Sequence, residues 1–452
     1  MSCALYKNYL LVILLLTAAF SMGETTVLGQ LMQPMAADLH LSDMQLGVLT
    51  GIAYALCHAP AAIFLGRWAD RGNRVTILAL MIVVLSVAMV GYTVAASFLQ
   101  VLLIRGCVAM AAAGCSPAAV SLISDYFTRA ERPRAFARFT LGWYLPSLIG
   151  SLAVGWLGEL YGWRVTFGLL GLPGLMLAAV VRLTLKEPRV ARPASGSGSA
   201  LEEAVTAQQS DVAEAAPTAL KDVLRNLWIN VTTRHLLLYS VVGAFFSNGV
   251  TQFQSVFLIR SYGLKPGELG VWFAMMGLSA LVGTYWGGGW ASRYAANNER
   301  LQFKVGGAVY ASLAPFSAMT YFTSHRYLTF ALLGLTALVG AIPTGPILSA
   351  VQTAMPASQR ATSYALMNLL GGLIGMGLGP LAAGALSDLL RPLLGQDSLR
   401  YASIALCPGY LWCGWHLWQA AKSVERDLET QRDRCPPAAI DSSAPHTEVI
   451  SR

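Results

Sequence analysis

The stretch Gly66-Arg67-Trp68-Ala69-Asp70-Arg71 decides the fold, because a close copy, Gly288-Gly289-Trp290-Ala291-Ser292-Arg293, occurs later in the same chain of 452 residues. Each copy follows two long apolar runs. A polar loop repeated between repeated apolar runs is typical of a membrane transporter built from two similar halves.

Other short stretches repeat in the same order. Leu46-Gly47-Val48 matches Leu269-Gly270-Val271, and Leu148-Ile149-Gly150 matches Leu373-Ile374-Gly375. The offset between copies stays between 222 and 226 residues. One match alone is weak, but an ordered set at a nearly constant offset indicates that both halves of the chain share one fold.

The composition excludes an ordinary soluble domain. The chain is 55% hydrophobic and 12% charged, whereas soluble proteins carry about 25% charged residues. The net charge of +8 comes from basic residues at the ends of the apolar runs, a pattern that orients a protein in a lipid bilayer. We therefore predict no nucleic-acid partner. The seven cysteines have no metal-binding spacing, so no metal or cofactor is expected either.

Twelve apolar runs are long enough to cross a membrane, which takes ~20 residues in a helix. Six runs in each half give parallel repeats, because an even number of crossings returns the chain to the side on which it began. We predict an all-α polytopic membrane protein with 12 transmembrane helices in two six-helix parallel repeats. The runs lie near residues 9–31, 45–66, 75–96, 99–124, 136–158, 163–184, 235–258, 268–290, 302–323, 327–355, 361–385 and 398–420.

The predicted domains are a first bundle over 1–184, a cytoplasmic linker over 185–234, a second bundle over 235–420 and a cytoplasmic tail over 421–452. Low-complexity composition predicts disorder for residues 187–219 and for the tail. Apolar residues from Leu220 to Trp228 recur at helical spacing, which predicts an amphipathic helix. That helix either couples the two halves or simply rests on the membrane.

Orientation follows from the basic residues. Most of the 31 Lys and Arg residues fall in cytoplasmic segments if both termini are cytoplasmic. We predict a monomeric multi-pass protein of the bacterial inner membrane with that orientation.

Glu24 is the acidic residue that lies deepest within a predicted span, on one helix face with Thr17 and Ser21. A charge at that depth costs at least ~2.5 kcal/mol, so Glu24 needs a cavity or a partner. Arg105 lies at the same predicted depth in the fourth span. Burial opposes ionisation of the carboxyl group and a nearby guanidinium favours it, so the pair can link protonation to conformation. The alternatives are a merely hydrogen-bonded carboxyl group and an arginine that reaches the interface.

Several uncharged polar residues are candidates for the lining of a substrate cavity. Each also has a simpler explanation: His58 as a buried hydrogen-bonded imidazole, and the amides as contacts that hold helices together. The candidates are Ser21, His58, Tyr144, Asn248, Gln252 and Asn368.

The chain resembles the major facilitator superfamily over essentially its whole length. The loop from Gly66 to Arg74 carries the resemblance. Three stretches resemble the bacterial spinster-like branch: Ala37 to Asp43, Arg105-Gly106 with Ser116 to Ala119, and Tyr161 to Arg164. The resemblance implies the superfamily's fold, a substrate site between the halves, and an acid and an arginine in the first and fourth helices, where Glu24 and Arg105 stand. Thr25 and Ala112 replace two further charged residues of the branch, which leaves its usual polar network incomplete.

The resemblance also implies a cytoplasmic latch, in which Asp70 caps the eleventh helix and binds arginines while Gly66 allows close helix packing. In the second copy, Ser292 replaces Asp70, so the latch is expected to be asymmetric. Asp125 is a predicted partner of Arg71 or Arg129. The alternative for each arginine is plain inside-positive charge. The latch residues are Gly66, Asp70, Arg71, Arg74 and Asp125.

The sequence therefore predicts a secondary active transporter of a small organic or amphiphilic solute, working by rocker-switch alternating access and coupled to protons. It is not predicted to be an enzyme, because no nucleophile–base or metal constellation is present. Two alternatives stay open: an exporter or flippase of lysolipids or sphingolipid-type molecules, and a non-transporting membrane sensor on the same scaffold.

Overall fold

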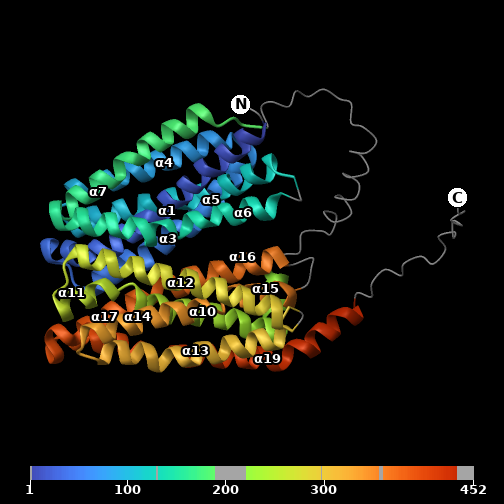
Figure 1. Cartoon of the computed structure of the whole chain (residues 1–452). Helices are drawn as coiled ribbons and strands as arrows, with labels where there is room; N and C mark the ends of the chain where they lie inside the picture. Colours follow the sequence, from blue (N-terminus) through green and yellow to red (C-terminus); the bar gives the residue numbers. More distant parts are fainter. Residues whose placement is uncertain (1–2, 129–130, 189–219, 297, 356–359, 435–452) are drawn as a thin grey trace, which may run out of the picture.

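The computed structural model describes residues 3–128, 131–188, 220–296, 298–355 and 360–434. Within these ranges the chain is helical and contains no strand. Figure 1 shows the long helices lying side by side in two layers, one from each half of the sequence.

The first layer contains seven α-helices and three short turns. They are α1 (Cys3–Leu39), α2 (Asp43–Thr50), α3 (Ile52–Arg71), α4 (Arg74–Gly91), η1 (Tyr92–Val94), α5 (Phe98–Tyr126), α6 (Arg132–Thr140), η2 (Leu141–Trp143), η3 (Pro146–Gly150) and α7 (Ser151–Thr184).

The second layer follows α9 (Leu220–Ile229). It contains α10 (Val231–Thr251), α11 (Gln254–Tyr262), α12 (Pro266–Tyr294), α13 (Glu299–Phe322), α14 (Arg326–Ala341), α15 (Thr344–Ala354), α16 (Arg360–Leu370), η4 (Gly371–Met376), α17 (Gly377–Leu394), η5 (Gly395–Asp397), α18 (Ser398–Leu406) and α19 (Gly409–Arg434).

Among the described residues, nine stretches are long and apolar enough to span a membrane. Two of them, Arg134–Thr184 with 51 residues and Thr362–Thr430 with 69, are long enough to cross twice. The first turns back at Gly162, whose φ of 74° favours glycine. The nine stretches, two of which cross twice, give eleven crossings. The 24-residue helix α13 gives the twelfth crossing that the sequence predicts.

The predicted amphipathic helix is present as α9. Its Leu227 is buried in an apolar cluster with Leu236 of α10 and Leu366 of α16. In this structure α9 therefore packs on the second layer. The predicted disorder of 187–219 lies almost wholly outside the described residues.

The predicted disorder of the tail is wrong between residues 421 and 434, where α19 continues as a helix. Val424 is completely buried. Asp427 accepts hydrogen bonds from the backbone N–H and the hydroxyl of Thr232, at 3.1 and 2.6 Å. The tail composition suggested a solvated segment, but the carboxylate of Asp427 binds the tail to the first turn of α10. Residues 435–452 lie outside the described part of the chain.

Each layer contains a wide helical turn at the same point of the repeat. The π-helical turns are η3 in the first layer and η4 in the second. They contain the repeated stretches Leu148-Ile149-Gly150 and Leu373-Ile374-Gly375. Because π-turns interrupt the regular helical ladder and recur at functional sites, the duplication has preserved a break in each layer as well as its helices.

The two layers meet closely at the end of the bundle away from both termini, here called the remote end. There α2 packs on α17, and α7 packs on α12. A Cβ on Gly47 would lie 2.4 Å from the carbonyl oxygen of Pro380, and one on Gly270 would lie 2.4 Å from that of Ser151. Gly47 and Gly270 are the glycines of the repeated Leu-Gly-Val. The duplicated motif thus provides the close backbone contact at each of these two helix crossings, α2 with α17 and α7 with α12.

Substituting Gly47 tests whether these crossings close the remote end. We expect Gly47→Ala to push the layers apart there, because the clashing atoms belong to backbone and cannot rotate away. Single-molecule fluorescence between dyes at Val94 and Leu393, both highly exposed, would report a longer distance. Gly345→Ala is the control, since a Cβ there meets no atom within 4 Å. An unchanged distance in Gly47→Ala would contradict the assignment.

Candidate functional site

The predicted pair forms: Arg105 of α5 donates a hydrogen bond to Glu24 of α1 and is ion-paired with it. Both side chains are buried, with 2% and 1% exposure. The hydroxyl of Tyr92 lies 3.5 Å from the other Glu24 oxygen. A buried ion pair adds little net stability, but removing one partner leaves a costly uncompensated charge. The arrangement is therefore sensitive to the charge state of Glu24.

Arg105 also connects this pair to α2. Its Nε donates to the carbonyl oxygen of Leu49 at 3.1 Å, in the last turn of α2, where helical carbonyls lack partners. The helix stops at Gly51, whose backbone is not helical. A positive charge at a helix C-terminus is favourable, so Arg105 stabilises the end of α2 while it neutralises Glu24.

A chain of aromatic side chains leads from Arg105 to His58. The guanidinium lies over the Tyr54 ring, 4.5 Å from its centroid, and Tyr54 stacks on His58 at 5.1 Å. His58 Nδ1 lies 3.1 Å from the carbonyl oxygen of Ala109. This arrangement matches the hydrogen-bonded imidazole that the sequence offered as the simpler alternative.

The remote end is joined by a second buried ion pair, between Asp43 of α2 and Arg260 of α11. Two nitrogens of Arg260 donate to the two carboxylate oxygens at 2.7 and 2.8 Å. Ser387 of α17 donates to the same carboxylate at 2.7 Å. Asp43 stands in a stretch that carries the family resemblance, but its role in this ion pair was not predicted. The available signal was Ser42-x-x-Gln45, a capping box that the structure confirms.

Each layer also caps a helix of the other. Asp388 of α17 accepts hydrogen bonds from the backbone N–H groups of Asp43 and Met44, at 3.1 and 2.8 Å. Glu159 of α7 accepts one from Gly267 at 3.2 Å, in the first turn of α12. A carboxylate at a helix N-terminus satisfies unpaired donors and favours the helix dipole. The two layers thus stabilise each other's helices reciprocally at the remote end.

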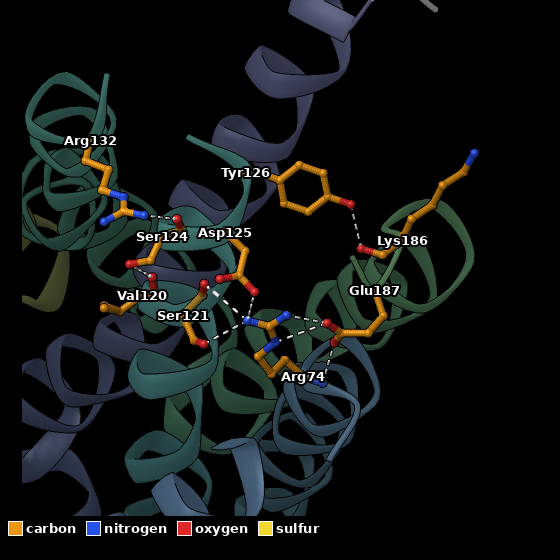
Figure 2. A network of polar contacts seen from close by, with 9 residues as sticks. All are labelled: Arg74, Val120, Ser121, Ser124, Asp125, Tyr126, Arg132, Lys186 and Glu187. Carbon is orange, nitrogen blue, oxygen red and sulfur yellow. Dashed lines mark hydrogen bonds and ion pairs between the residues drawn. The ribbon is translucent and has the colours of Figure 1, made fainter. Parts of the chain in front are cut away.

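At the opposite end, near the termini, Arg74 organises a network of polar contacts (Figure 2). Its guanidinium donates to Asp125 at 2.5 Å, to the Ser121 hydroxyl at 2.8 Å and to Glu187 at 3.1 Å. The Arg74 backbone N–H donates to Glu187 at 2.7 Å. Arg74 is completely buried, so it is more than the plain inside-positive charge that was the alternative.

This network adds a contact to the predicted latch. Arg74 forms an ion pair with Asp125, whereas the sequence predicted Arg71 or Arg129 as the partner of Asp125. Sequence reasoning missed Glu187 because it follows the last helix of the layer and comes near Arg74 only through folding. The side chains of Asp70 and Arg71, and residue Arg129, lie outside the described part of the structure.

Gly66 does not have the predicted packing role in this structure. A Cβ added to it would meet nothing within 4 Å. The close approaches described above lie at the remote end, and Gly66 lies toward the other end of α3. The prediction that Gly66 is needed for close packing is therefore wrong for this conformation.

The candidate cavity residues fall in different places. Gln252 lines a chamber of about 180 Å³ between the layers, together with Ser147. The carbonyl oxygen of Tyr144 accepts the Ser147 hydroxyl at 3.1 Å. Asn248 donates to Ala244 within its own helix at 2.8 Å, as expected for a structural amide.

The remaining two candidates lie elsewhere. Ser21 borders a small void beside Cys115, and Asn368 is exposed on α16. The structure thus gathers only part of the predicted set around one chamber.

A separate apolar cavity of about 270 Å³ lies beside the Glu24 pair in the first layer. Glu24 lines it, as do Pro146, Ile149 and Gly150 of the π-turn η3. Glu24, the π-turn η3 and several apolar side chains therefore line the same cavity.

Two crossing layers of membrane helices, with a charged pair buried in one of them, define an all-α polytopic membrane protein of the transporter class. Residues 13–380 match the sequence profile of the Major Facilitator Superfamily. The chain belongs to this superfamily. It is a membrane transporter of a small solute and not an enzyme.

Individual relatives agree with this assignment. The chain is 28% identical over 405 residues to an MFS-type efflux pump of Mycolicibacterium smegmatis, covering 88% of this chain and 89% of the relative. Its fold is similar to that of an inward-facing, unoccupied bacterial homologue of the human lysosomal transporter Spinster. That comparison has a TM-score of 0.81 at 25% identity, covering 93% and 98% of the two chains. The nucleoside transporter NupG shares the fold at 12% identity, with a TM-score of 0.69.

The first prediction from the site concerns the reciprocal caps. We expect Asp388→Ala to weaken the remote closure by about 1 kcal/mol, because the first turn of α2 loses a charged cap. The same fluorescence distance at the remote end would show a larger open population. Asp397→Ala is the control, because Asp397 pairs only with Arg400 of its own layer among the described contacts. Equal effects of the two variants would contradict the role of the cap.

The second prediction from the site concerns the Arg74 network. We expect Glu187→Ala to lower the free energy of unfolding by about 3 kcal/mol, because it removes one partner of a buried charge. Glu425→Ala breaks another Arg–Glu pair, which is exposed, and is expected to cost less than about 1 kcal/mol. Thermal unfolding of the detergent-solubilised protein compares them. A Glu187 variant as stable as the Glu425 variant would refute the network's importance.

Proposed function

We propose that this protein is a secondary active transporter that couples movement of a small organic or amphiphilic solute to protons through Glu24. The observation that carries the proposal is the buried Glu24–Arg105 pair, because Arg105 contacts both the carboxylate and the end of α2. A proton on Glu24 would remove the charge that holds Arg105. Arg105 would then be free to change its contact with Leu49.

The route from Arg105 to the remote closure is short. The helix α2 has only eight residues. Arg105 holds its C-terminal turn, and Asp388 of the other layer caps its N-terminal turn. A rearrangement of the ion pair therefore acts on an element that is itself part of the contact between layers. Protonation of Glu24 would therefore change the contact between the layers through one short helix, α2.

We further propose rocker-switch alternating access between bundles 1–184 and 235–420, with both termini cytoplasmic in a bacterial inner membrane. The inside-positive distribution of Lys and Arg supports that orientation. With it, the remote end is the outer face, and the structure is an inward-facing state. The similarity to an inward-facing homologue is consistent with this assignment.

The solute class follows from the cavities. The space beside Glu24 is mainly apolar, and the chamber between the layers is lined by uncharged residues. Neither offers a dense charge for a highly ionic solute. An exporter or flippase of lysolipid-type molecules is the second candidate, favoured by the apolar space next to the ion pair. The sensor alternative has no comparable supporting contact.

The test uses proteoliposomes. A thermal-shift screen on purified protein first identifies a ligand, because binding stabilises the native state. We expect Glu24→Gln to abolish accumulation of that ligand driven by a pH gradient while it still permits exchange in counterflow, since Gln cannot release a proton. Glu425→Gln, an exposed acid that lies outside both the pair and the remote closure, is the control and should retain accumulation. Gradient-driven accumulation by Glu24→Gln across a pH series would refute the coupling.

A further inference from the structure

A cavity of about 450 Å³ lies between the layers at the remote end, and none of the described residues that line it is acidic. The end of α1 and the turn that follows it form one side, while α11, α17 and η5 contribute to the other. A molecule in this cavity would therefore contact both layers where they close. The lining side chains that can form hydrogen bonds are Gln33, His40, Ser42, Arg260, Arg391 and Gln396.

Arg391 of α17 is a half-exposed charge whose donors are not used within the protein. Its Nη1 lies 4.0 Å from Oδ1 of Asp388, which is beyond the length of a hydrogen bond. Both oxygens of Asp388 already accept backbone N–H groups at the start of α2. Within the described part of the chain Arg391 forms no hydrogen bond. Its guanidinium is therefore available to a ligand beside the first turn of α2.

Gln33 of α1 is held so that its amide nitrogen is left as a donor. The Nε of Arg260 donates to Gln33 Oε1 at 3.0 Å. Because a guanidinium has only donors, the atom next to it must be the amide oxygen. The amide nitrogen has no partner among the described residues, and it is not one of the buried polar atoms. A ligand in the cavity can therefore reach it.

Two further donors lie in the turn between α1 and α2. The hydroxyl oxygen of Ser42 accepts the backbone N–H of Gln45, so the hydroxyl hydrogen remains to be donated. His40 is exposed, and its ring makes no hydrogen bond or ion pair with the described residues. An imidazole always carries at least one N–H donor. The unused donors of this cavity thus come from both layers.

The backbone at His40 shows that its side chain is kept at a conformational cost. With a φ of 52°, it is the one non-glycine residue of the described chain in the left-handed region. It follows the end of α1, and the N–H of Leu41 bonds back to the carbonyl oxygen of Ala36 at 2.9 Å. Glycine is the usual residue at this position of a helix end. The imidazole can therefore be removed without disturbing the backbone.

We propose that this cavity binds a phosphate group and that Arg391 provides the charge that holds it. Arginine binds phosphate through paired charge-assisted hydrogen bonds. Donors on two sides favour a tetrahedral phosphate, whose oxygens point in several directions, over a planar carboxylate. The first-layer donors bind it from one side and Arg391 from the other, so it joins the layers only while the remote end is closed. Because a ligand shifts the equilibrium toward the state that it binds better, this phosphate group is an effector that favours closure.

The experiment measures the melting temperature of the purified full-length protein in dodecyl maltoside while inorganic phosphate replaces chloride at constant ionic strength. Binding to the folded state raises the melting temperature saturably. We expect Arg391→Gln to need about tenfold more phosphate for the same rise, because one charge-assisted hydrogen bond is worth about that factor. Arg326→Gln removes an exposed arginine at the start of α14, outside the lining, and should respond as the wild type does. Phosphate also stabilises proteins in general, so the difference between these two variants is the readout.

A second variant separates loss of binding from loss of folding. We expect His40→Gly to be at least as stable as the wild type without phosphate, since glycine adopts a positive φ at no steric cost. It should nevertheless need more phosphate for the same rise in melting temperature. A response of His40→Gly equal to that of the wild type would remove His40 from the site.

Two sources offer such a phosphate, a soluble anion and a lipid headgroup. Mixed micelles with phosphatidylglycerol and no added phosphate test the headgroup, again by comparing Arg391→Gln with Arg326→Gln. Equal responses of these two variants to both probes would overturn the proposal. A larger open population at the remote end on adding the effective probe, measured by the same fluorescence distance, would overturn it as well. No proton gradient is used, and Glu24→Gln should retain the response, so this proposal and coupling at Glu24 fail separately.

Discussion

A charge buried among membrane helices must be paired, and the rest of this structure depends on how that requirement is met at Arg105. The guanidinium neutralises Glu24, lies on Tyr54 and caps the last turn of α2. One side chain therefore joins three helices of the first layer. The same requirement acts at Arg74 and Arg260, whose partners also come from distant segments. Each buried arginine ties together elements that the chain alone leaves apart.

Closure of the remote end combines two kinds of interaction. Glycines of the duplicated Leu-Gly-Val allow backbones to touch, and carboxylates from each layer cap a helix of the other. Close packing is effective only over a fraction of an ångström, and a cap is effective only over the first turn of a helix. The proposed transport cycle requires the layers to separate at this end, and both kinds of interaction would then be lost together.

Sequence reasoning located the central pair because depth in a span can be counted: Glu24 and Arg105 lie at equal predicted depth, and they meet. It did not predict that Arg74 pairs with Asp125, because Arg71, Arg74 and Arg129 all lie in predicted cytoplasmic segments and spacing does not distinguish them. Glu187 and Asp388 were missed since each acts on a helix start that is distant in sequence.

By itself the sequence determined the membrane environment, the twelve crossings, the duplication and the acidic residue that needs a partner. These follow from local quantities: apolar length, repeat offset and the cost of a buried charge. Only the tertiary structure decided which end of the bundle is closed and which arginine pairs with which acid. Those features depend on distances between segments far apart in the chain, and such distances are set when the two layers pack together.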